Sequence, residues 1–582
     1  MLQIAEIIKK HCISYLKINN IEDIVIESVR FTVDINKDID RGDLYTNFAL
    51  VSSKILKQDP TAIAVNLAQY LDKELDKNIF KKIEAIDNYV NFYLVDEFVS
   101  EDSENIYHKD FDSKKIAYEY TDPNPMKEFH IGHLMSNTIG ETLSRIAQMA
   151  GADIKRYSYQ GDAGRHLAVT MWGLRFMETP WPDADNISIT DKVKFLGQAY
   201  VMGNKKLSES KEKGEDSDEY KQYMQEIEVM NQKIYDRSDE EVNIIYDQGR
   251  EWSLEKFEEL YNILGTKFDY YFFESKSAPV GLQIVKDDLE KENSIFAKGD
   301  NDTVIFKGED HGLHTRVFVT SKGIPTYEAK EIGLAKIKYD VWNFDKSIVI
   351  TANEQNEVFK VTNKVISLLI PDIGPKMSHI SHGMMRFVGE KMSSRTGKVI
   401  AGDELVEDMM NASYEKMKDR DMEEGDKKQI SQDVAVAAIK FSILKQNFKK
   451  DIIFDKEKSL SLEGDSGPYI QYAVVRINSI LKKTEGLEIA KTERELSKET
   501  ENLNRTLWRY NHMCFKAIDE MAPQYIAQYL IDLASRFNTF YNKNKIIEGD
   551  KVDKGLLELC VKTKDILTRG LDTLGIRVVE RM

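Results

Sequence analysis

The stretch PNPMKEFHIGH, residues 123–133, decides the fold of this chain, because it places a turn, a lysine and two histidines directly before a predicted helix. Upstream, residues 114–121, KKIAYEYT, predict a buried strand. Downstream, residues 131–150 repeat apolar side chains at close to helical spacing, and Gly151 supplies a stop. Residues 153–159, DIKRYSY, predict a second strand. The sequence therefore predicts a strand–helix–strand unit whose helix N-terminal amides point at bound anions.

The two histidines of this stretch suit phosphate binding. His130 and His133 lie on nearly the same face of the predicted helix, so both can donate to phosphate oxygens, and Gly132 lets a flat base lie against the backbone. An isolated pair with this spacing is more often two surface histidines. The interpretation therefore depends on a second motif, GEKMSSRTGK at 389–398, a basic loop that can fold over phosphates but alone is better explained as a solvated turn.

Taken together, the two motifs point to a family. HIGH at 130–133 and KMSSR at 391–395, about 260 residues apart, resemble the paired signatures of class I aminoacyl-tRNA synthetases. The resemblance implies that ATP, with Mg²⁺ on its phosphates, activates an amino acid that is then esterified to tRNA. Residues 382–387, HGMMRF, look like the family's adenine-packing strand, although a core strand explains them equally well. The implied ATP-binding residues are Gly132, His130, His133, His382, Gly383, Met384, Met385, Lys391, Ser393, Ser394 and Arg395.

Composition fits a multidomain enzyme of 582 residues. Cys12, Cys514 and Cys560 are scattered without CxxC spacing, which argues against disulfides and against zinc and fits a reducing cytoplasm. No apolar run approaches the roughly 18 residues that span a bilayer, and the first residues lack a signal-peptide profile. We expect a cytoplasmic protein with no zinc and no membrane partner.

The net charge of −17 does not exclude RNA binding, because the basic residues are unevenly distributed. Residues 445–582 contain 24 Lys and Arg against 21 Asp and Glu, a net charge of +3, whereas residues 1–444 carry −20. This asymmetry weakly favours an RNA contact in the C-terminal part. A helical domain with a mixed-charge surface explains the counts almost as well.

The expected fold class is α/β: a Rossmann-like parallel-sheet catalytic domain with an N-terminal α+β domain and a C-terminal all-α helical bundle. Residues 1–110 form the N-terminal domain, a tRNA contact, with strands at 25–35 and near 89–95 separated by helices. The catalytic domain spans 111–400, with an insertion at about 171–300 and the KMSSR loop at 391–398. Connecting helices at 401–454 lead to the helical domain at 455–582.

A narrower resemblance covers the chain from end to end, to the arginyl-tRNA synthetases. DRGDLYTNFAL at 40–50 resembles part of that family's N-terminal domain. SLEGDSGPYIQYAVVRI at 461–477 and RFNTFYNK at 536–543 resemble its DALR-type anticodon-binding domain, and LGIRVVERM resembles its usual ending. The implied tRNA-binding residues are Tyr469, Gln471, Tyr472, Arg476, Arg536, Asn538 and Tyr541.

Five residues match the family's contacts to the amino acid: Glu119, Asn124, Tyr327, Glu331 and Gln355. A guanidinium requires carboxylate and carbonyl-type acceptors. Tyr327 and Glu331 are four residues apart and share a face if their segment is helical. A lone Glu or Tyr at such spacing is more often structural, so the assignment rests on the set. The insertion is too short for a large editing domain, and a site built on hydrogen bonds needs none.

The chain departs from the family pattern at four positions. Ser394 stands where a second loop lysine is common, and the resemblance implies that Lys127 compensates. Glu331 replaces an aspartate, Asp122 a serine, and Ala163 the tryptophan of the GDWG sequence. A longer acid at 331 and an extra carboxylate at 122 change the depth and the charge of the predicted pocket.

The resemblance implies an arginine–tRNA ligase that forms arginyl-adenylate and transfers arginine to tRNA(Arg), releasing AMP and pyrophosphate. Its catalytic residues are His130, His133, Lys127 and Lys391, which stabilise the charge on the phosphates. The partners are L-arginine, ATP and tRNA(Arg), and we expect a monomer. Two alternatives stay open: another class I synthetase, or a degenerate paralogue that binds tRNA without catalysis. The intact motifs argue against the second.

Overall fold

The computed structural model describes residues 2–100, 110–182, 187–388, 401–490 and 496–582. The chain divides into two compact units. We call residues 107–468, with 571–580 and 582, the sheet unit, and residues 1–106, with 469–570 and 581, the terminal unit. The boundary falls near the start of helix α17 (Gly467–Thr484) and near the end of helix α21 (Lys554–Thr573).

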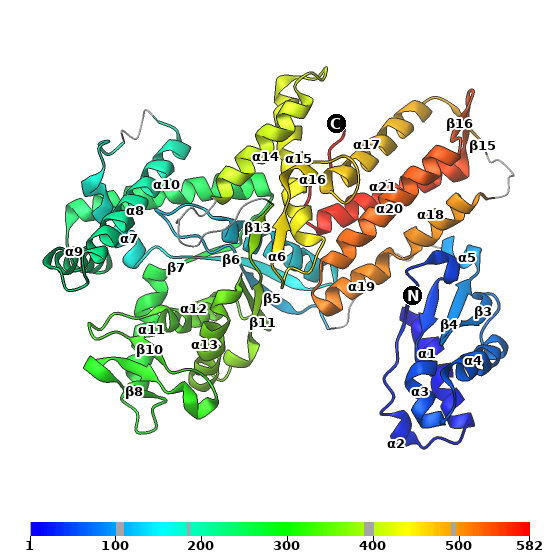
Figure 1. Ribbon diagram of the computed structural model, residues 1–582, viewed down its shortest axis with the longest axis horizontal. Helices are drawn as coiled ribbons and strands as arrows, with labels where there is room; N and C mark the ends of the chain where they lie inside the picture. Colours follow the sequence, from blue (N-terminus) through cyan, green and yellow to red (C-terminus); the bar gives the residue numbers. More distant parts are fainter. Residues whose placement is uncertain (1, 101–109, 183–186, 389–400, 491–495) are drawn as a thin grey trace. The chain divides into compact units, whose positions relative to one another are not determined.

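The centre of the sheet unit is a five-stranded sheet in the order β12-β11-β5-β6-β7, and every neighbouring pair is parallel (Figure 1). Its strands are β5 (Lys115–Glu119), β6 (Asp153–Gln160), β7 (Tyr270–Phe273), β11 (Lys346–Ala352) and β12 (Met377–His382). Helix α6 (Ile131–Met149) joins β5 to β6, and Gly151 follows it with φ +101°. The predicted strand–helix–strand unit is confirmed.

The order in which the chain forms the strands of this sheet determines where a ligand site is expected. From β5 the chain builds the sheet towards β6 and β7, and then returns to the other side of β5 with β11 and β12. The connections therefore diverge between β5 and β11, and ligands of open α/β sheets bind outside the carboxyl ends of the strands at such a switch point. The stretch at 123–133 leaves the carboxyl end of β5.

The other elements of the sheet unit are short or helical. The helices are α7 (Arg165–Gly173), α8 (Ile189–Glu212), α9 (Asp218–Asp236), α10 (Glu240–Leu264), α11 (Glu274–Leu289), α12 (Tyr327–Val341), α13 (Asn356–Leu369), α14 (Gly402–Met417), α15 (Glu424–Leu444) and α16 (Lys456–Ser459). A small antiparallel sheet contains β8 (Phe296–Lys298), β9 (Val304–Phe306) and β10 (Arg316–Val319), and β13 (Met385–Phe387) pairs with β14 (Ile452–Phe454) in parallel.

Helices α11 and α12 approach closely because glycines face each other across their contact. A Cβ on Gly281 would lie 1.8 Å from the carbonyl oxygen of Ala329, and one on Gly333 would lie 2.1 Å from that of Ser277. Real side chains do not tolerate such distances. The two glycines therefore fix the position of α12, which carries Tyr327 and Glu331.

The segment expected as an insertion, 171–300, contains part of the central sheet. Its strand β7 pairs with β6, and α11 follows directly. Helices α7 to α10 instead share a separate hydrophobic cluster that includes Leu167, Trp172, Leu196 and Trp252. The part outside the sheet is thus shorter than expected and helical.

The N-terminal part of the terminal unit is an α+β fold, as expected. Its antiparallel sheet has the order β1-β2-β4-β3, with β1 (Val33–Ile35), β2 (Leu44–Thr46), β3 (Phe80–Ile86) and β4 (Tyr89–Leu94). Its helices are α1 (Leu2–Ile18), α2 (Asp23–Ile26), α3 (Phe48–Leu56), α4 (Pro60–Glu74) and α5 (Asp96–Ser100). The strand expected at 25–35 is wrong except for its last three residues. Buried Ile26, Val29 and Val33 recur every three or four residues, not every two.

The C-terminal part consists of helices with one small sheet. The helices are α17 (Gly467–Thr484), α18 (Lys498–Trp508), α19 (Tyr510–Glu520), α20 (Gln524–Lys543) and α21 (Lys554–Thr573). The sheet, β15-β17-β16, joins β15 (Glu488–Ala490), β16 (Ile547–Glu548) and β17 (Lys551–Asp553). In the terminal unit this part contacts the N-terminal fold, where Arg505 forms an ion pair with Asp43 at 2.5 Å.

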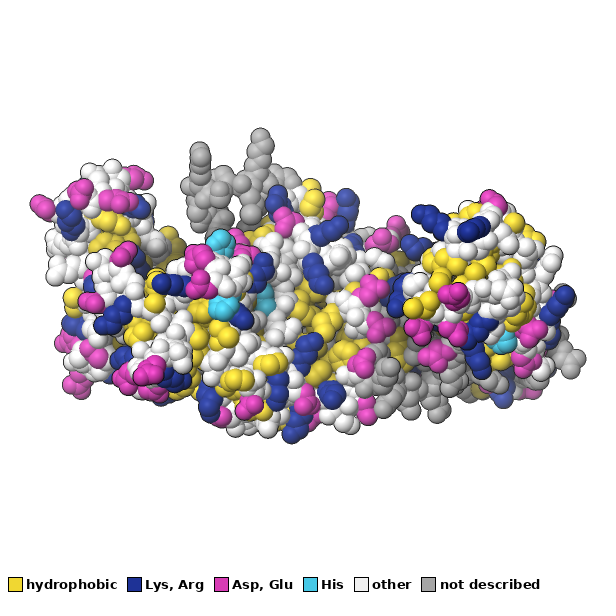
Figure 2. Space-filling model, turned by 90° about the horizontal axis from the view of Figure 1, so that it is seen from below, with side chains coloured by type: hydrophobic (Ala, Val, Ile, Leu, Met, Phe, Trp, Pro, Cys, Tyr) yellow, Lys and Arg dark blue, Asp and Glu magenta, His cyan; other side chains and the backbone are white. Residues whose placement is uncertain are grey.

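The surface carries both signs of charge. On the face shown in Figure 2, the described basic and acidic side chains are interspersed. No helix of the described ranges has the length and apolar character needed to cross a membrane.

Candidate active site

A cavity of about 510 Å³ opens at the carboxyl ends of β5, β6 and β11. Eight of the residues predicted from sequence line it: Glu119, Asn124, His130, Gly132, His133, Tyr327, Gln355 and His382. They come from segments more than 250 residues apart in the chain. The cavity therefore brings predicted nucleotide contacts and predicted amino-acid contacts into one space.

The two histidines are held as neutral hydrogen-bond donors. His130 is the N-cap of α6, where its Nδ1 accepts from the Gly132 amide at 3.1 Å, and Nδ1 of His133 accepts from the His130 amide at 3.2 Å. With both Nδ1 atoms accepting, each neutral ring carries its proton on Nε2. The rings stack 3.6 Å apart. Each of the two rings therefore keeps an Nε2–H donor.

The surroundings of these histidines keep them uncharged. Burial, with the charge of Lys127, lowers the pKa of His130 to about 4, and burial with the charges of His130 and Lys127 holds the pKa of His133 well below its usual value. A Cβ on Gly132 would lie 2.9 Å from the His130 ring. The glycine therefore leaves room for the His130 ring.

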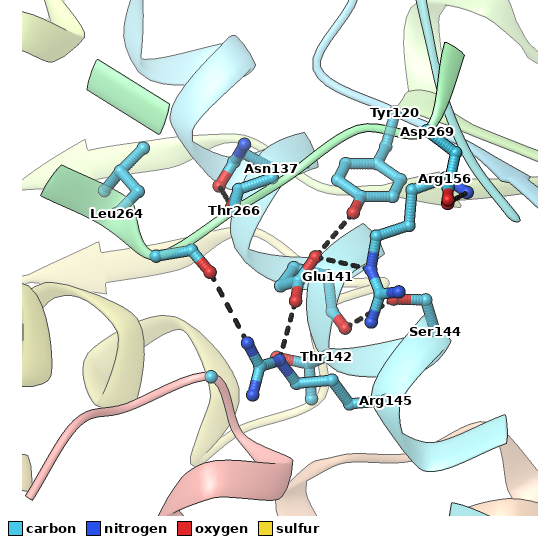
Figure 3. A network of polar contacts seen from close by, with 12 residues as sticks. Tyr120, Asn137, Glu141, Thr142, Ser144, Arg145, Arg156, Leu264, Thr266 and Asp269 are labelled. Atoms are coloured by element: carbon cyan, nitrogen blue, oxygen red, sulfur yellow. Dashed lines mark hydrogen bonds and ion pairs between the residues drawn. The ribbon is translucent and has the colours of Figure 1, made fainter. Parts of the chain in front are cut away.

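A buried polar network around Glu141 holds α6 in place (Figure 3). The Glu141 carboxylate accepts from the Tyr120 hydroxyl at 2.6 Å, from Arg145 Nε at 2.6 Å and from Arg156 Nε at 3.0 Å. Burial alone would raise the pKa of Glu141, but the charges of Arg156 and Arg145 lower it overall. A Cβ on Gly140 would lie 2.2 Å from the Tyr120 ring. The network therefore fixes the helix against β5, whose chain continues into Tyr120.

The predicted amino-acid contacts surround a group of buried carboxylates. Oε2 of Glu119 lies 2.6 Å from the ammonium of Lys338, and both side chains are almost fully buried. Glu331 lies behind the lining of the cavity, hydrogen-bonded to Tyr327, and its buried Oε1 has no hydrogen-bond partner among the described residues. Burial and the charge of Glu119 raise the pKa of Glu331 to about 8. An unpaired buried acceptor of this kind is suited to a cationic ligand.

Asp122, named from sequence only as a departure, lines the cavity. Its Oδ1 accepts from the Tyr159 amide at 2.7 Å, and burial and the charge of Glu119 raise its pKa well above the usual value. Thr121 and Asp122 have φ of +81° and +46°, a strained backbone for side-chain-bearing residues. The turn after β5 thus directs an additional carboxylate into the cavity.

The GDAG sequence at 161–164 fits against the predicted contacts. A Cβ on Gly161 would lie 2.1 Å from Oδ1 of Asn124, so only glycine leaves that amide in place. The Asp162 carboxylate accepts from the Ser275 amide at 2.8 Å and from Arg250 Nε at 3.0 Å. The loop is therefore a wall of the site. Nothing seen here accounts for Ala163 in place of tryptophan.

Two further ion pairs at the cavity were not predicted. Glu274 lies 2.7 Å from Lys330, and Arg316 lies 3.4 Å from Glu328. Glu274, Arg316 and Glu328 line the cavity. Lys330 directly precedes Glu331 and could have been singled out, but no sequence pattern marks Arg316.

The other predicted ATP contacts are only partly described. Lys391, Ser393, Ser394 and Arg395 lie outside the described residues. Met385 is buried in β13, the Met384 amide donates to Asp451, and Gly383 abuts the backbone of Lys450. Lys127 lies near both histidines, with its ammonium 5.5 Å from the ring centroid of Tyr200 on α8.

Five of the seven predicted tRNA contacts cluster in the terminal unit. The cluster consists of Tyr469, Tyr472, Arg476, Asn538 and Tyr541. Arg476 donates to Asn538 at 2.5 Å, and its guanidinium lies 5.0 Å and 5.8 Å from the ring centroids of Tyr472 and Tyr541. Arg536 instead pairs with Asp532 at 2.9 Å. Gln471 is fully buried, so its side chain packs inside the protein.

The parallel sheet and the histidine-capped helix at its switch point define a class I aminoacyl-tRNA synthetase. Sequence models of known families match nearly the whole chain. The class I (R) tRNA synthetase catalytic domain matches residues 95–456, the arginyl tRNA synthetase N-terminal domain residues 2–94, and the DALR anticodon binding domain residues 470–582. The chain therefore belongs to the arginyl-tRNA synthetase family, and its activity is that of an arginine–tRNA ligase.

Individual relatives agree with this assignment. Arginine–tRNA ligase of Clostridium botulinum is 28% identical over 602 residues, covering 100% of this chain and 99% of the relative. That of Clostridium acetobutylicum is 29% identical over 581 residues, covering 97% and 98%. In fold, the chain is similar to arginyl-tRNA synthetase of Thermus thermophilus, with a TM-score of 0.78 at 24% identity over 99% of this chain and 100% of that one.

Proposed function

We propose that the cavity of the sheet unit is where this ligase activates L-arginine with ATP, and that its carboxylates select the amino acid. The observation that carries the proposal is the convergence, at one cavity, of the two Nε2 donors with the Asp122 carboxylate in the lining and Glu331 behind it, neither of which forms an ion pair among the described residues. Histidine donors suit a triphosphate, and unpaired carboxylates suit a guanidinium.

The first step is in-line attack on ATP. An oxygen of the arginine α-carboxylate forms a bond to the α-phosphorus, and the bond from that phosphorus to the bridging oxygen of pyrophosphate breaks. His130 and His133 donate to the phosphate oxygens, and Lys127 and Lys391 add positive charge as pyrophosphate leaves. No side-chain nucleophile takes part, so the protein contributes position and electrostatic stabilisation.

Magnesium enters this site with the nucleotide. Within the described ranges, no group of three or more His, Cys, Asp or Glu side chains could hold a metal ion. When bound with ATP, Mg²⁺ on the phosphates would neutralise part of their charge.

The second step is transfer to tRNA. A hydroxyl of the 3′-terminal adenosine forms a bond to the arginyl carbonyl carbon, and AMP leaves. We assign binding of tRNA(Arg) to the Arg476 cluster of the terminal unit, since tyrosines beside an arginine suit stacking on bases. We further propose that the ligase works in the cytoplasm as a monomer.

The test is charging of purified total tRNA with each amino acid separately. Charging of tRNA with arginine alone supports the proposal, and charging with a different amino acid refutes it. No charging with retained tRNA binding would select a catalytically inactive tRNA-binding protein. A His133→Gln variant should lose activation, whereas His314→Gln, a change at an exposed histidine, should not.

A further inference from the structure

The carboxylates around the cavity differ in how their charge is balanced. Glu119, Asp122, Glu274 and Glu328 line the cavity, and Glu331 lies behind it. Three of the five have an ion-pair partner: Glu119 with Lys338, Glu274 with Lys330, and Glu328 with Arg316. In the described part of the chain, Asp122 and Glu331 form no ion pair. Since each of these two acids feels the charge of Glu119, the three carboxylates act as one cluster.

Lys338 is the cation of this cluster. It lies near the end of α12, and its Nζ is 2.6 Å from Oε2 of Glu119, with side-chain exposures of 0% and 2%. Positions 327, 331 and 338 share one helical face, so Lys338 approaches the cluster from the same side as Tyr327 and Glu331. Because the lysine occupies Oε2, the other oxygen of Glu119 is the one left for a ligand in the cavity.

We propose that Lys338 is a positioning residue for arginine recognition: it holds Glu119 by one oxygen and balances the three-carboxylate cluster for the two cationic groups of arginine. This inference rests on the proposed function of the cavity. Three ionised carboxylates and one ammonium carry a net charge of −2. The guanidinium and the α-ammonium of arginine together balance this −2, and the α-carboxylate of arginine, which reacts with the α-phosphate, lies outside the count. A buried site with unbalanced charge is strongly disfavoured, which is why the match matters.

The electrostatics of the cluster agree with this role. Burial and the charge of Glu119 raise the pKa of Asp122 and of Glu331, and Lys338 acts in the opposite direction on both. Without the lysine, these carboxyls would hold their protons more firmly at neutral pH. The protons that arginine has to displace on binding would then cost more free energy to remove than in the wild-type site.

The experiment compares Lys338→Met with a matched control on the same helix. Lys336 pairs with Asp340 at the surface and is 44% exposed, so Lys336→Met removes a lysine of α12 without touching the cluster. In arginylation of tRNA at pH 7, Lys338→Met should raise the KM for arginine at least ~10-fold, leave the KM for ATP within ~2-fold, and move the pH dependence of arginine KM to higher pH. Lys336→Met should change none of these.

A double variant separates positioning from folding. Glu119→Gln combined with Lys338→Met replaces a buried ion pair by neutral groups, which proteins tolerate better than a single unpaired charge. If Lys338 acts through Glu119, the arginine KM of the double variant should match that of Glu119→Gln within ~3-fold. A further ~10-fold rise, or an unchanged arginine KM in Lys338→Met, would overturn the proposal. A wild-type protein that charges a different amino acid would refute the proposed function, and this inference with it.

Discussion

Arginine binding should depend on pH because the empty site holds a proton. With the pKa of Glu331 raised to about 8, only about one molecule in eleven has this carboxyl ionised at pH 7. Arginine binds the ionised form, so its apparent affinity at pH 7 is reduced by that fraction, about 11-fold or ~1.4 kcal/mol. At pH 8 half of the molecules are ionised. Raising the pH from 7 to 8 should therefore strengthen arginine binding at least about 5-fold.

Arginine affinity should rise with pH because the pKa of Glu331 is raised. A carboxyl with a raised pKa is protonated below that pKa, so the cost of removing its proton falls as the pH rises through 8. Isothermal titration calorimetry in two buffers of different ionisation enthalpy measures the protons released. At pH 7 at least about 0.9 proton should leave per arginine bound, and Asp122, raised in the same direction, adds to the count.

The matched variant is Glu331→Gln, which keeps the size of the side chain and removes the titrating group. This variant should bind arginine more weakly. It should also release fewer protons on binding, and its arginine affinity should change less between pH 7 and pH 8. A wild-type affinity that stays constant between pH 7 and pH 8, with no proton released, would refute the electrostatic description of the pocket.

Three further predictions follow from contacts in the two units. Lys127→Ala should slow ATP–pyrophosphate exchange by ~10²-fold with tRNA affinity nearly unchanged, and a loss below threefold would reject its compensating role. Gly161→Ala should raise the arginine KM about 10-fold, because the new Cβ would displace the amide of Asn124; an unchanged KM would count against that contact. Arg476→Ala should weaken tRNA binding about 10-fold at fixed salt and leave the KM for arginine and ATP as in the wild type, and equal tRNA affinity would remove the cluster from the tRNA surface.

The sequence was most informative where neighbours in the chain are also neighbours in space. Helix α6 and its flanking strands were predictable because hydrophobic period, a glycine stop and the histidine pair all lie within about forty residues. The five arginine contacts came from resemblance to a family. The prediction of a strand at 25–35 was wrong because the apolar residues that become buried there are three and four positions apart, whereas a strand buries every second residue.

By itself, the sequence determined the family, the strand–helix–strand unit and eight of the residues that line the cavity. Only the tertiary structure decided which charges meet there. Glu119 and Lys338 are 219 residues apart in the chain, and Glu274 and Lys330 are 56 apart. Coulomb interactions depend on distance in space and on burial, neither of which can be read from separation along the chain. The balance of charge that suits the site to arginine is therefore a property of the folded protein.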